Sequence, residues 1–225
     1  MGSMISFEGN GEEFAGYLAA PASGGGPGLL VLQEYWGLVD HIKDLCERFS
    51  QEGFLALAPD LYKGDTTRDP DDATTMMQAL NIAETERILA EAARTLLDRR
   101  ECASETVGVI GFCMGGQLAL FAATENPKIS ACVDFYGIHP KVQPSFRNLH
   151  GPVLGIFAEK DHMTTQEVVK ALDRELTVLE KPHEFHTYPG TDHAFFNDTR
   201  PEVYDAEAAA DAWKRTVAFL KENIR

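Results

Sequence analysis

The sequence is poor in three things: cysteine, positive charge and long apolar runs. Its 225 residues include 20 Lys and Arg against 35 Asp and Glu, so the formal net charge is −15. Nucleic acids and anionic membrane surfaces attract proteins through cationic patches, and this charge argues against both as partners. No apolar run approaches the roughly 20 residues that a membrane-spanning helix needs. We therefore expect no binding to nucleic acid or to a membrane.

The cysteines are too scattered to indicate a redox pair or a zinc site. Cys46, Cys102, Cys113 and Cys132 form no C-x-x-C pair, and no Cys/His cluster has zinc spacing. No signal peptide precedes the first apolar segment, and residues 1–3 are expected to be a tag remnant before a natural start at Met4. These features predict a reduced, cytoplasmic protein without a bound metal.

Apolar runs and helical patterns alternate along the whole chain, which predicts an α/β fold: a mostly parallel central sheet with helices on both faces. The segments 5–7 and 14–19 alternate enough to form a hairpin-like pair at one sheet edge. No internal repeat or long linker divides the chain, so residues 1–225 are expected to form a single domain. Further strands are predicted at 29–32, 54–58, 107–110, 130–136, 153–158 and 184–188, and helices at 39–51, 73–99 with a break near Asn81, 115–126, 165–179 and 206–222.

The run Val107–Gly116 carries the most information about function. Within it, Gly111-Phe112-Cys113-Met114-Gly115 has the nucleophile-elbow pattern G-x-S-x-G with cysteine in place of serine. Such a turn is strained, and glycine is needed on each side because a Cβ there would crowd it. The turn lifts one side chain above the sheet and leaves backbone N–H groups free beside it. The pattern therefore predicts a nucleophile, Cys113, and an oxyanion site together.

Three other reactive residues follow predicted strands: Glu34, Asp161 and His193. Catalytic groups of a parallel sheet gather beyond the carboxyl ends of its strands, so these side chains are expected to meet Cys113. The chain order nucleophile, acid, histidine is that of α/β-hydrolases. Cys113 would attack a carbonyl carbon as thiolate, His193 would move the proton, and Asp161 would orient the imidazole.

The predicted oxyanion donors are the backbone N–H groups of Met114 and Tyr35. The N-terminus of the helix after Cys113 would favour negative charge on the sulfur and on the oxyanion. Each reactive residue also has a structural alternative. Cys113 could be a small buried hydrophobe, His193 a satisfied loop histidine, Asp161 a helix cap, and Glu34 the partner of a buried cation.

These residues resemble the dienelactone hydrolase family of α/β-hydrolases along nearly the whole chain. The resemblance rests on five motifs: Gln33–Gly37, Ala58–Tyr62, Gly111–Gly116, Glu159–Asp161 and Tyr188–Phe196. It implies carboxymethylenebutenolidase-type activity, which opens a lactone by hydrolysis, and a triad of Cys113, Asp161 and His193. It also implies that Glu34 contacts the thiol and helps to form the thiolate, and that no metal or organic cofactor takes part.

The sequence departs from the family where the dienelactone enzyme uses two arginines to hold the substrate carboxylate. At these two places this chain has Phe195-Phe196-Asn197-Asp198 and the neutral segment Met76–Asn81, and its nearest cations are Arg87 and Arg200. A buried carboxylate ligand usually needs such a cation, so a neutral ester, lactone or aryl ester is the expected substrate. The predicted substrate-binding residues are Trp36, Tyr136, Phe195, Phe196, Arg87 and Arg200.

The sequence thus predicts a cysteine-dependent hydrolase of carboxylic esters or lactones with an acyl-enzyme on Cys113, acting on a small molecule as a monomer or homodimer. Two alternatives stay open. The same triad could hydrolyse thioesters or peptides, or the chain could be a catalytically silent homologue that binds a small ligand. A substrate panel separates the first from esterase activity, and selective alkylation of Cys113 argues against the second.

Overall fold

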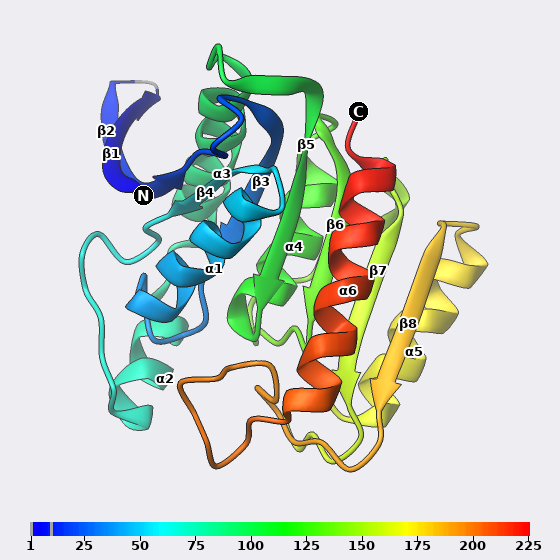
Figure 1. Cartoon of the computed structure of the whole chain (residues 1–225). Coiled ribbons are helices and arrows are strands. Elements are labelled where there is room, and N and C mark those ends of the chain that lie inside the picture. The colour runs from blue at the N-terminus through cyan, green and yellow to red at the C-terminus, as the bar shows by residue number, and fades with distance from the viewer. Residues whose placement is uncertain (1, 10) are drawn as a thin grey trace.

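A computed structural model of the chain describes residues 2–9 and 11–225, which form an eight-stranded sheet in the order β1-β2-β4-β3-β5-β6-β7-β8 (Figure 1). Strand β2 runs antiparallel to both of its neighbours, β1 and β4, and all other neighbours are parallel. The mostly parallel sheet with an antiparallel pair at its edge is thereby confirmed. The strands are β1 (Ser3–Gly9), β2 (Glu12–Ala19), β3 (Gly26–Leu32), β4 (Leu55–Pro59), β5 (Cys102–Phe112), β6 (Ile129–Phe135), β7 (Val153–Ala158) and β8 (His183–Tyr188).

Helices cover both faces of this sheet. In Figure 1, α1 and α6 lie in front of it, and α3, α4 and α5 lie behind it. The helices are α1 (Asp40–Gln51), α2 (Pro70–Ala79), α3 (Ile82–Leu97), α4 (Met114–Glu125), α5 (Gln166–Val178) and α6 (Ala206–Asn223), with a short 3-10 helix at Phe146–Asn148.

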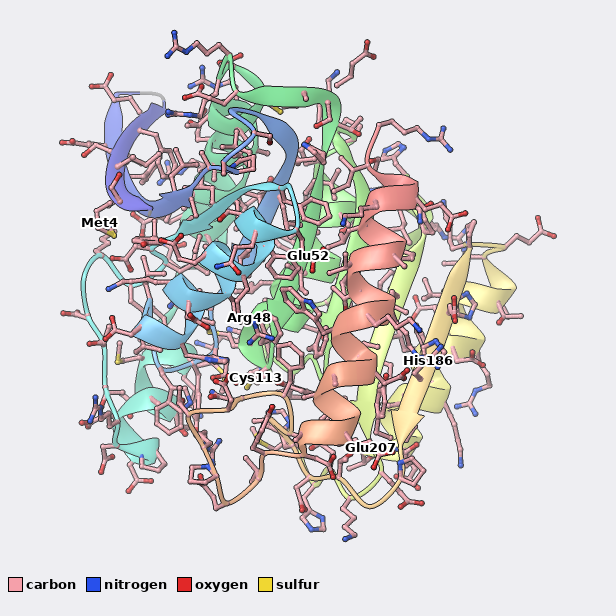
Figure 2. All side chains as sticks on the ribbon, viewed as in Figure 1. Met4, Arg48, Glu52, Cys113, His186 and Glu207 are labelled. Atoms are coloured by element: carbon pink, nitrogen blue, oxygen red, sulfur yellow. The ribbon has the colours of Figure 1, made fainter. Side chains whose placement is uncertain are left out.

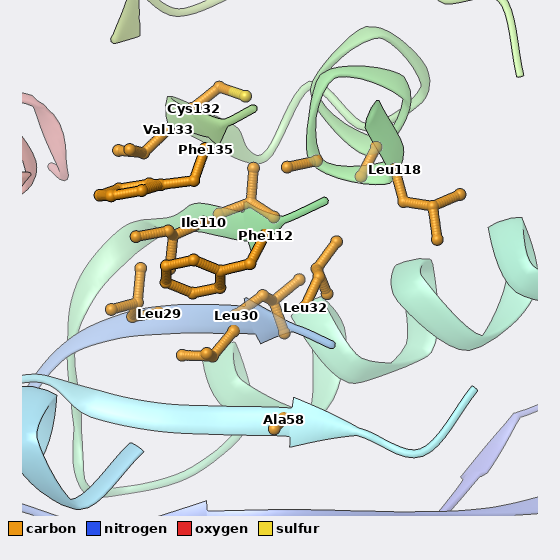
Figure 3. Close-up of a cluster of buried hydrophobic side chains, with 14 of the residues drawn as sticks. Leu29, Leu30, Leu32, Ala58, Ile110, Phe112, Leu118, Cys132, Val133 and Phe135 are labelled. Carbon is orange, nitrogen blue, oxygen red and sulfur yellow. The ribbon is translucent and has the colours of Figure 1, made fainter. Parts of the chain in front are cut away.

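The central strands are buried on both faces because helices cover both. Every residue of β4 and β7 is buried, and so are Leu29–Leu32 of β3. Figure 3 shows part of this core, in which side chains of β3, β5 and β6 pack together. A sheet covered in this way needs continuous apolar strands, which is why these segments carry no alternation of polar residues.

The helical pattern after β4 is broken near Asn81, as predicted, but it begins earlier than predicted. Helix α2 starts at Pro70 rather than Ala73. The side chain of Asp69 accepts hydrogen bonds from the N–H groups of Asp71 and Asp72, and Pro70 occupies the first helical position, where no N–H partner is needed. Asn81 caps α3 by accepting from Glu84 N–H. The Asp-rich segment before residue 73 is thus a helix start rather than loop throughout.

The elbow between β5 and α4 requires its glycines. A Cβ on Gly111 would overlap the carbonyl group of Gly115, and a Cβ on Gly115 would lie 2.5 Å from the Leu32 carbonyl oxygen at the end of β3. Both obstacles are backbone atoms, which cannot move aside as the end of a flexible side chain can. The two glycines therefore let α4 begin directly against β3 and β5, which places the residue between them at the edge of the sheet.

Candidate active site

Cys113 occupies the turn between β5 and α4 in a strained backbone conformation. Its φ is 54° and its ψ is −119°, a combination that a residue with a Cβ adopts only when the surroundings enforce it. The turn is held by the Cys113 N–H, which donates to the Phe135 carbonyl at 3.0 Å, and by the Cys113 carbonyl, which accepts from Ile138 N–H at 3.1 Å. Figure 2 shows Cys113 at the carboxyl end of the central strands. Its side chain stands at the N-terminus of α4, where negative charge is favoured.

Asp161 and His193 form a direct pair, although they follow different strands. Their closest atoms, Asp161 Oδ2 and His193 Nδ1, are 2.7 Å apart, and the Asp161 side chain is fully buried. The other carboxyl oxygen of Asp161 accepts from the N–H groups of Met163 and Thr164 at 2.7 and 2.9 Å. Asp161 is therefore held rigidly by the turn after β7, and it orients His193 in the loop after β8.

The pKa values of this pair follow from their contact. Burial opposes a charge on His193, but the hydrogen bond to Asp161 and the nearness of Cys113 outweigh it and raise the pKa of His193 to about 10. Burial also opposes the charge on Asp161, yet the bond from His193 and the two backbone N–H groups hold its pKa below the usual value. An imidazolium next to an ionised aspartate is thus favoured at neutral pH, and such an imidazolium stabilises a thiolate beside it.

This pair should make the stability of the fold depend on pH. Because the pKa of His193 rises from 6.5 to about 10 on folding, its contribution is fully present below pH 6.5 and is lost as the pH rises toward 10. We expect the free energy of unfolding to fall more steeply across this range in the wild type than in His193→Gln. Urea denaturation followed by circular dichroism measures both slopes, and parallel slopes would contradict the expectation.

Glu34 lies in the first loop after β3 and is almost fully buried. Its Oε2 accepts a hydrogen bond of 2.8 Å from the side-chain amide of Asn197, which is itself buried. The Asn197 carbonyl oxygen in turn accepts from the N–H and hydroxyl groups of Thr199. The partner of Glu34 is thus a neutral amide from the loop after β8, not a buried cation. Sequence reasoning did not single out Asn197, since no motif marks it.

A cavity of about 430 Å³ opens between these loops. Predicted residues that line it are Glu34, Tyr35, Trp36, Cys113, His193 and Arg200. The sequence prediction missed other lining residues, namely Lys160, His162, Met163, Asp192, Ala194, Glu202 and Val203. Several of these are neighbours of Asp161 or His193 in the sequence, which is the signal that could have indicated them.

Four of the predicted substrate-binding residues do not line this cavity. Phe195 and Phe196 are buried: Phe195 packs against Tyr136 and Tyr188, and Phe196 stacks on Phe112. They belong to the hydrophobic core, because the loop after His193 turns inward and packs over the sheet.

Tyr136 is also fully buried, with its ring 4.9 Å from that of His193, so it supports the histidine from behind. Arg87 lies elsewhere, on α3, where it pairs with Glu12 at 3.2 Å. Arg200 does reach the cavity, with its guanidinium 5.8 Å from the Trp36 ring centre and 2.9 Å from Glu202.

Two backbone N–H groups beside Cys113 are free to bind an oxyanion. Within the described part of the chain, neither Met114 N–H nor Tyr35 N–H donates a hydrogen bond. Met114 is the first residue of α4, where N–H groups have no partner inside the helix. Gly115 in the first turn of α4 packs against the carbonyl groups of Leu32 and Gln33, and Tyr35 lies two residues after Gln33. The N–H groups of Met114 and Tyr35 therefore belong to the same junction of β3 and α4.

Residues 2–9 and 11–225 hold neither a metal-binding cluster nor a membrane-spanning helix. No group of three or more His, Cys, Asp or Glu side chains there is placed to hold a metal ion. None of the helices in those residues has the length and hydropathy that a bilayer crossing requires.

Comparison with known proteins agrees with the geometry. The model of the dienelactone hydrolase family matches residues 14–224. The chain is 38% identical to "Protein usf" of Aquifex pyrophilus and 34% identical to the "Putative carboxymethylenebutenolidase" of Aquifex aeolicus, each over the full length of both proteins. Among solved structures, a "Putative Dienelactone Hydrolase" from Klebsiella pneumoniae superposes with a TM-score of 0.88 at 30% identity and covers 98% of each chain. With its α/β-hydrolase fold and a match over nearly its whole length, the chain belongs to the dienelactone hydrolase family of hydrolases.

Proposed function

We propose that the protein hydrolyses carboxylic esters or lactones through an acyl-enzyme on Cys113. One observation carries the proposal: a thiol in a strained elbow lies in the same cavity as a histidine that a buried aspartate holds at 2.7 Å. Strain of this kind persists where the fold enforces it, and it commonly marks a functional residue. A merely structural cysteine would need neither the elbow nor the oriented histidine.

The steps follow from the positions of the groups. The Cys113 thiolate attacks the carbonyl carbon of the ester, and the oxyanion that forms is bound by the N–H groups of Met114 and Tyr35. His193, charged and held by Asp161, gives its proton to the leaving alkoxide as the acyl–oxygen bond breaks. It then removes a proton from water, which attacks the thioester and releases the acid. In a lactone the leaving alkoxide stays attached to the acyl group, so the ring opens.

The charges around the cavity support a neutral substrate. Three carboxylates, Glu34, Asp192 and Glu202, line it beside the thiolate–imidazolium pair of Cys113 and His193, which carries no net charge. The remaining cations are Lys160 and Arg200, and Arg200 is already paired with Glu202. An anionic substrate would have to displace that pairing, or bind the exposed and hydrated Lys160 close to the cavity's carboxylates. Aryl esters and neutral lactones meet Trp36 and Tyr35 without this cost.

A hydrolysis panel tests the proposal. It compares neutral lactones, p-nitrophenyl esters, an acyl thioester and a peptide amide, with iodoacetamide-treated enzyme as the control. We expect turnover of esters and lactones, loss of that turnover on alkylation, and at least tenfold lower kcat/KM for an ester carrying a carboxylate than for its neutral isostere. Faster turnover of the thioester or peptide, or none at all, would overturn the assignment.

Glu34 is proposed to help form the thiolate when substrate enters. Replacing its carboxylate by the Glu34→Gln change keeps the size of the side chain and removes the charge beside Cys113. We expect kcat and the rate of Cys113 alkylation to fall about a hundredfold, the lower end of the range of general acid–base effects. Asp192→Asn removes another carboxylate of the same cavity, but an exposed one, and should change both rates less than threefold. Equal effects of the two substitutions would assign Glu34 only a general electrostatic role.

A further inference from the structure

A second cavity, of about 350 Å³, lies between α4, α5 and the loop after β6. It shares no lining residue with the active-site cavity, and the proposed reaction does not use it. The two are adjacent through Thr164, which lines the second cavity while its N–H donates to Asp161. Its walls combine the polar side chains of Gln117, Gln143 and Thr164 with apolar ones, which include Leu120, Val142, Phe146, Phe157, Val169 and Leu172.

One of the carboxyl groups in this wall is buried. Asp134, near the end of β6, is 1% exposed and lines the cavity. Its Oδ1 accepts from Gly137 N–H at 2.8 Å, while within the described chain no donor reaches Oδ2. Gly116 and Gly137 make room for this carboxyl, because a Cβ on either would overlap Oδ1. A buried carboxylate with a single hydrogen bond is unfavourable unless some further partner satisfies it.

No other group of the cavity satisfies the charge. Of the described lining residues none is Lys, Arg or His, and the second charged side chain, the exposed Glu175, is also acidic. Burial raises the pKa of Asp134 to about 7, against the opposing effects of the Gly137 N–H and of His193. The cavity therefore combines several apolar side chains with an under-satisfied acidic group, and among the described residues no cluster of three His, Cys, Asp or Glu side chains is placed there to hold a metal ion.

We propose that this cavity binds a small organic ammonium ion, whose apolar body packs between α4 and α5 and whose amino group donates to Asp134. The ammonium supplies both the missing hydrogen-bond donor and the opposite charge, and charge-assisted hydrogen bonds of this kind are the stronger ones. The apolar body leaves water for a wall of aliphatic and aromatic side chains, as in most small-molecule sites. This inference does not depend on the proposed esterase activity.

Isothermal titration of the full chain with benzylamine at pH 8 tests the site. Benzyl alcohol, of nearly the same shape but neutral, is the matched probe. We expect saturable binding of one benzylamine, with benzyl alcohol at least tenfold weaker. Asp134→Asn keeps an acceptor for Gly137 N–H and removes the charge, so it should weaken benzylamine at least tenfold and leave benzyl alcohol unchanged. Treating Cys113 with iodoacetamide should alter neither, because Cys113 lies in the other cavity.

A second variant keeps the test decisive if Asp134→Asn fails to fold. Val168 is 44% exposed and lines the cavity from α5, so Val168→Trp places an indole at the entrance and should abolish binding of both probes. Glu175→Gln, at the same entrance, should change benzylamine affinity less than threefold. The proposal is overturned if no saturable binding occurs, if both probes bind equally, if a folded Asp134→Asn or Val168→Trp variant binds benzylamine as the wild type does, or if alkylation of Cys113 removes the binding.

Discussion

Cys113→Ala is expected to lower kcat/KM for p-nitrophenyl acetate by at least about a thousandfold while the fold persists. Removal of the proposed nucleophile would leave only the proposed oxyanion donors and substrate binding to promote attack by water, and in triad enzymes that residual catalysis is orders of magnitude below the complete site. The fold should persist, because Cys113 is small and alanine can occupy the same turn with one atom less. Initial rates and urea denaturation measure the two quantities.

The matched control is Cys102→Ala. Cys102 is a half-buried thiol at the start of β5, far along the strand from the elbow. This substitution should change kcat/KM less than twofold, and iodoacetamide should still inactivate the variant. Cys113→Ala with more than a tenth of wild-type activity would exclude an acyl-enzyme on Cys113 and would point to the histidine activating water directly.

Asp161→Asn is expected to lower kcat about a thousandfold to ten-thousandfold with little change in KM. Asparagine has the same shape, but its neutral amide cannot stabilise the imidazolium charge. It can also present an N–H group to His193 where the carboxylate accepts a hydrogen bond, and this favours the wrong imidazole tautomer. Loss of the carboxylate should also lower the pKa of His193, since that contact is a main cause of its rise. Histidine NMR titration detects this shift independently of activity.

Asp211→Asn provides the comparison for a carboxylate of a different kind. Asp211 is a half-exposed residue of α6 that accepts from Arg215 and Tyr188, away from the active-site cavity. Its loss should leave kcat unchanged and affect stability by less than about 1 kcal/mol, as surface ion pairs do. An Asp161→Asn enzyme with kcat within tenfold of wild type would show that another group orients His193.

Most elements could be predicted from the sequence because their signals are local. The buried strands are continuous apolar runs, and the elbow is a five-residue pattern whose glycines are explained by contacts with nearby backbone, at Gly115 and Leu32. The break at Asn81 was indicated by a residue type that caps helices. Element ends were less predictable from the apolar pattern alone: the early start of α2 follows from a different local signal, the Asp69 cap and Pro70 at the first helical position.

The sequence alone determined the order of the reactive groups along the chain and their places after strands, since the parallel sheet brings strand ends together whatever the loops do.

The sequence could not determine whether the side chain of a loop residue enters the core or lines the cavity. Phe195 and Phe196 follow the histidine directly, as pocket residues would, yet they turn into the core, whereas Arg200, farther along the chain, returns to the cavity. Only the tertiary structure decided this, because the path of that loop depends on packing against Phe112 and Tyr136, residues far away in the sequence. The same holds for the Asn197–Glu34 bond and for the buried carboxyl of Asp134, which arise from contacts that no local pattern records.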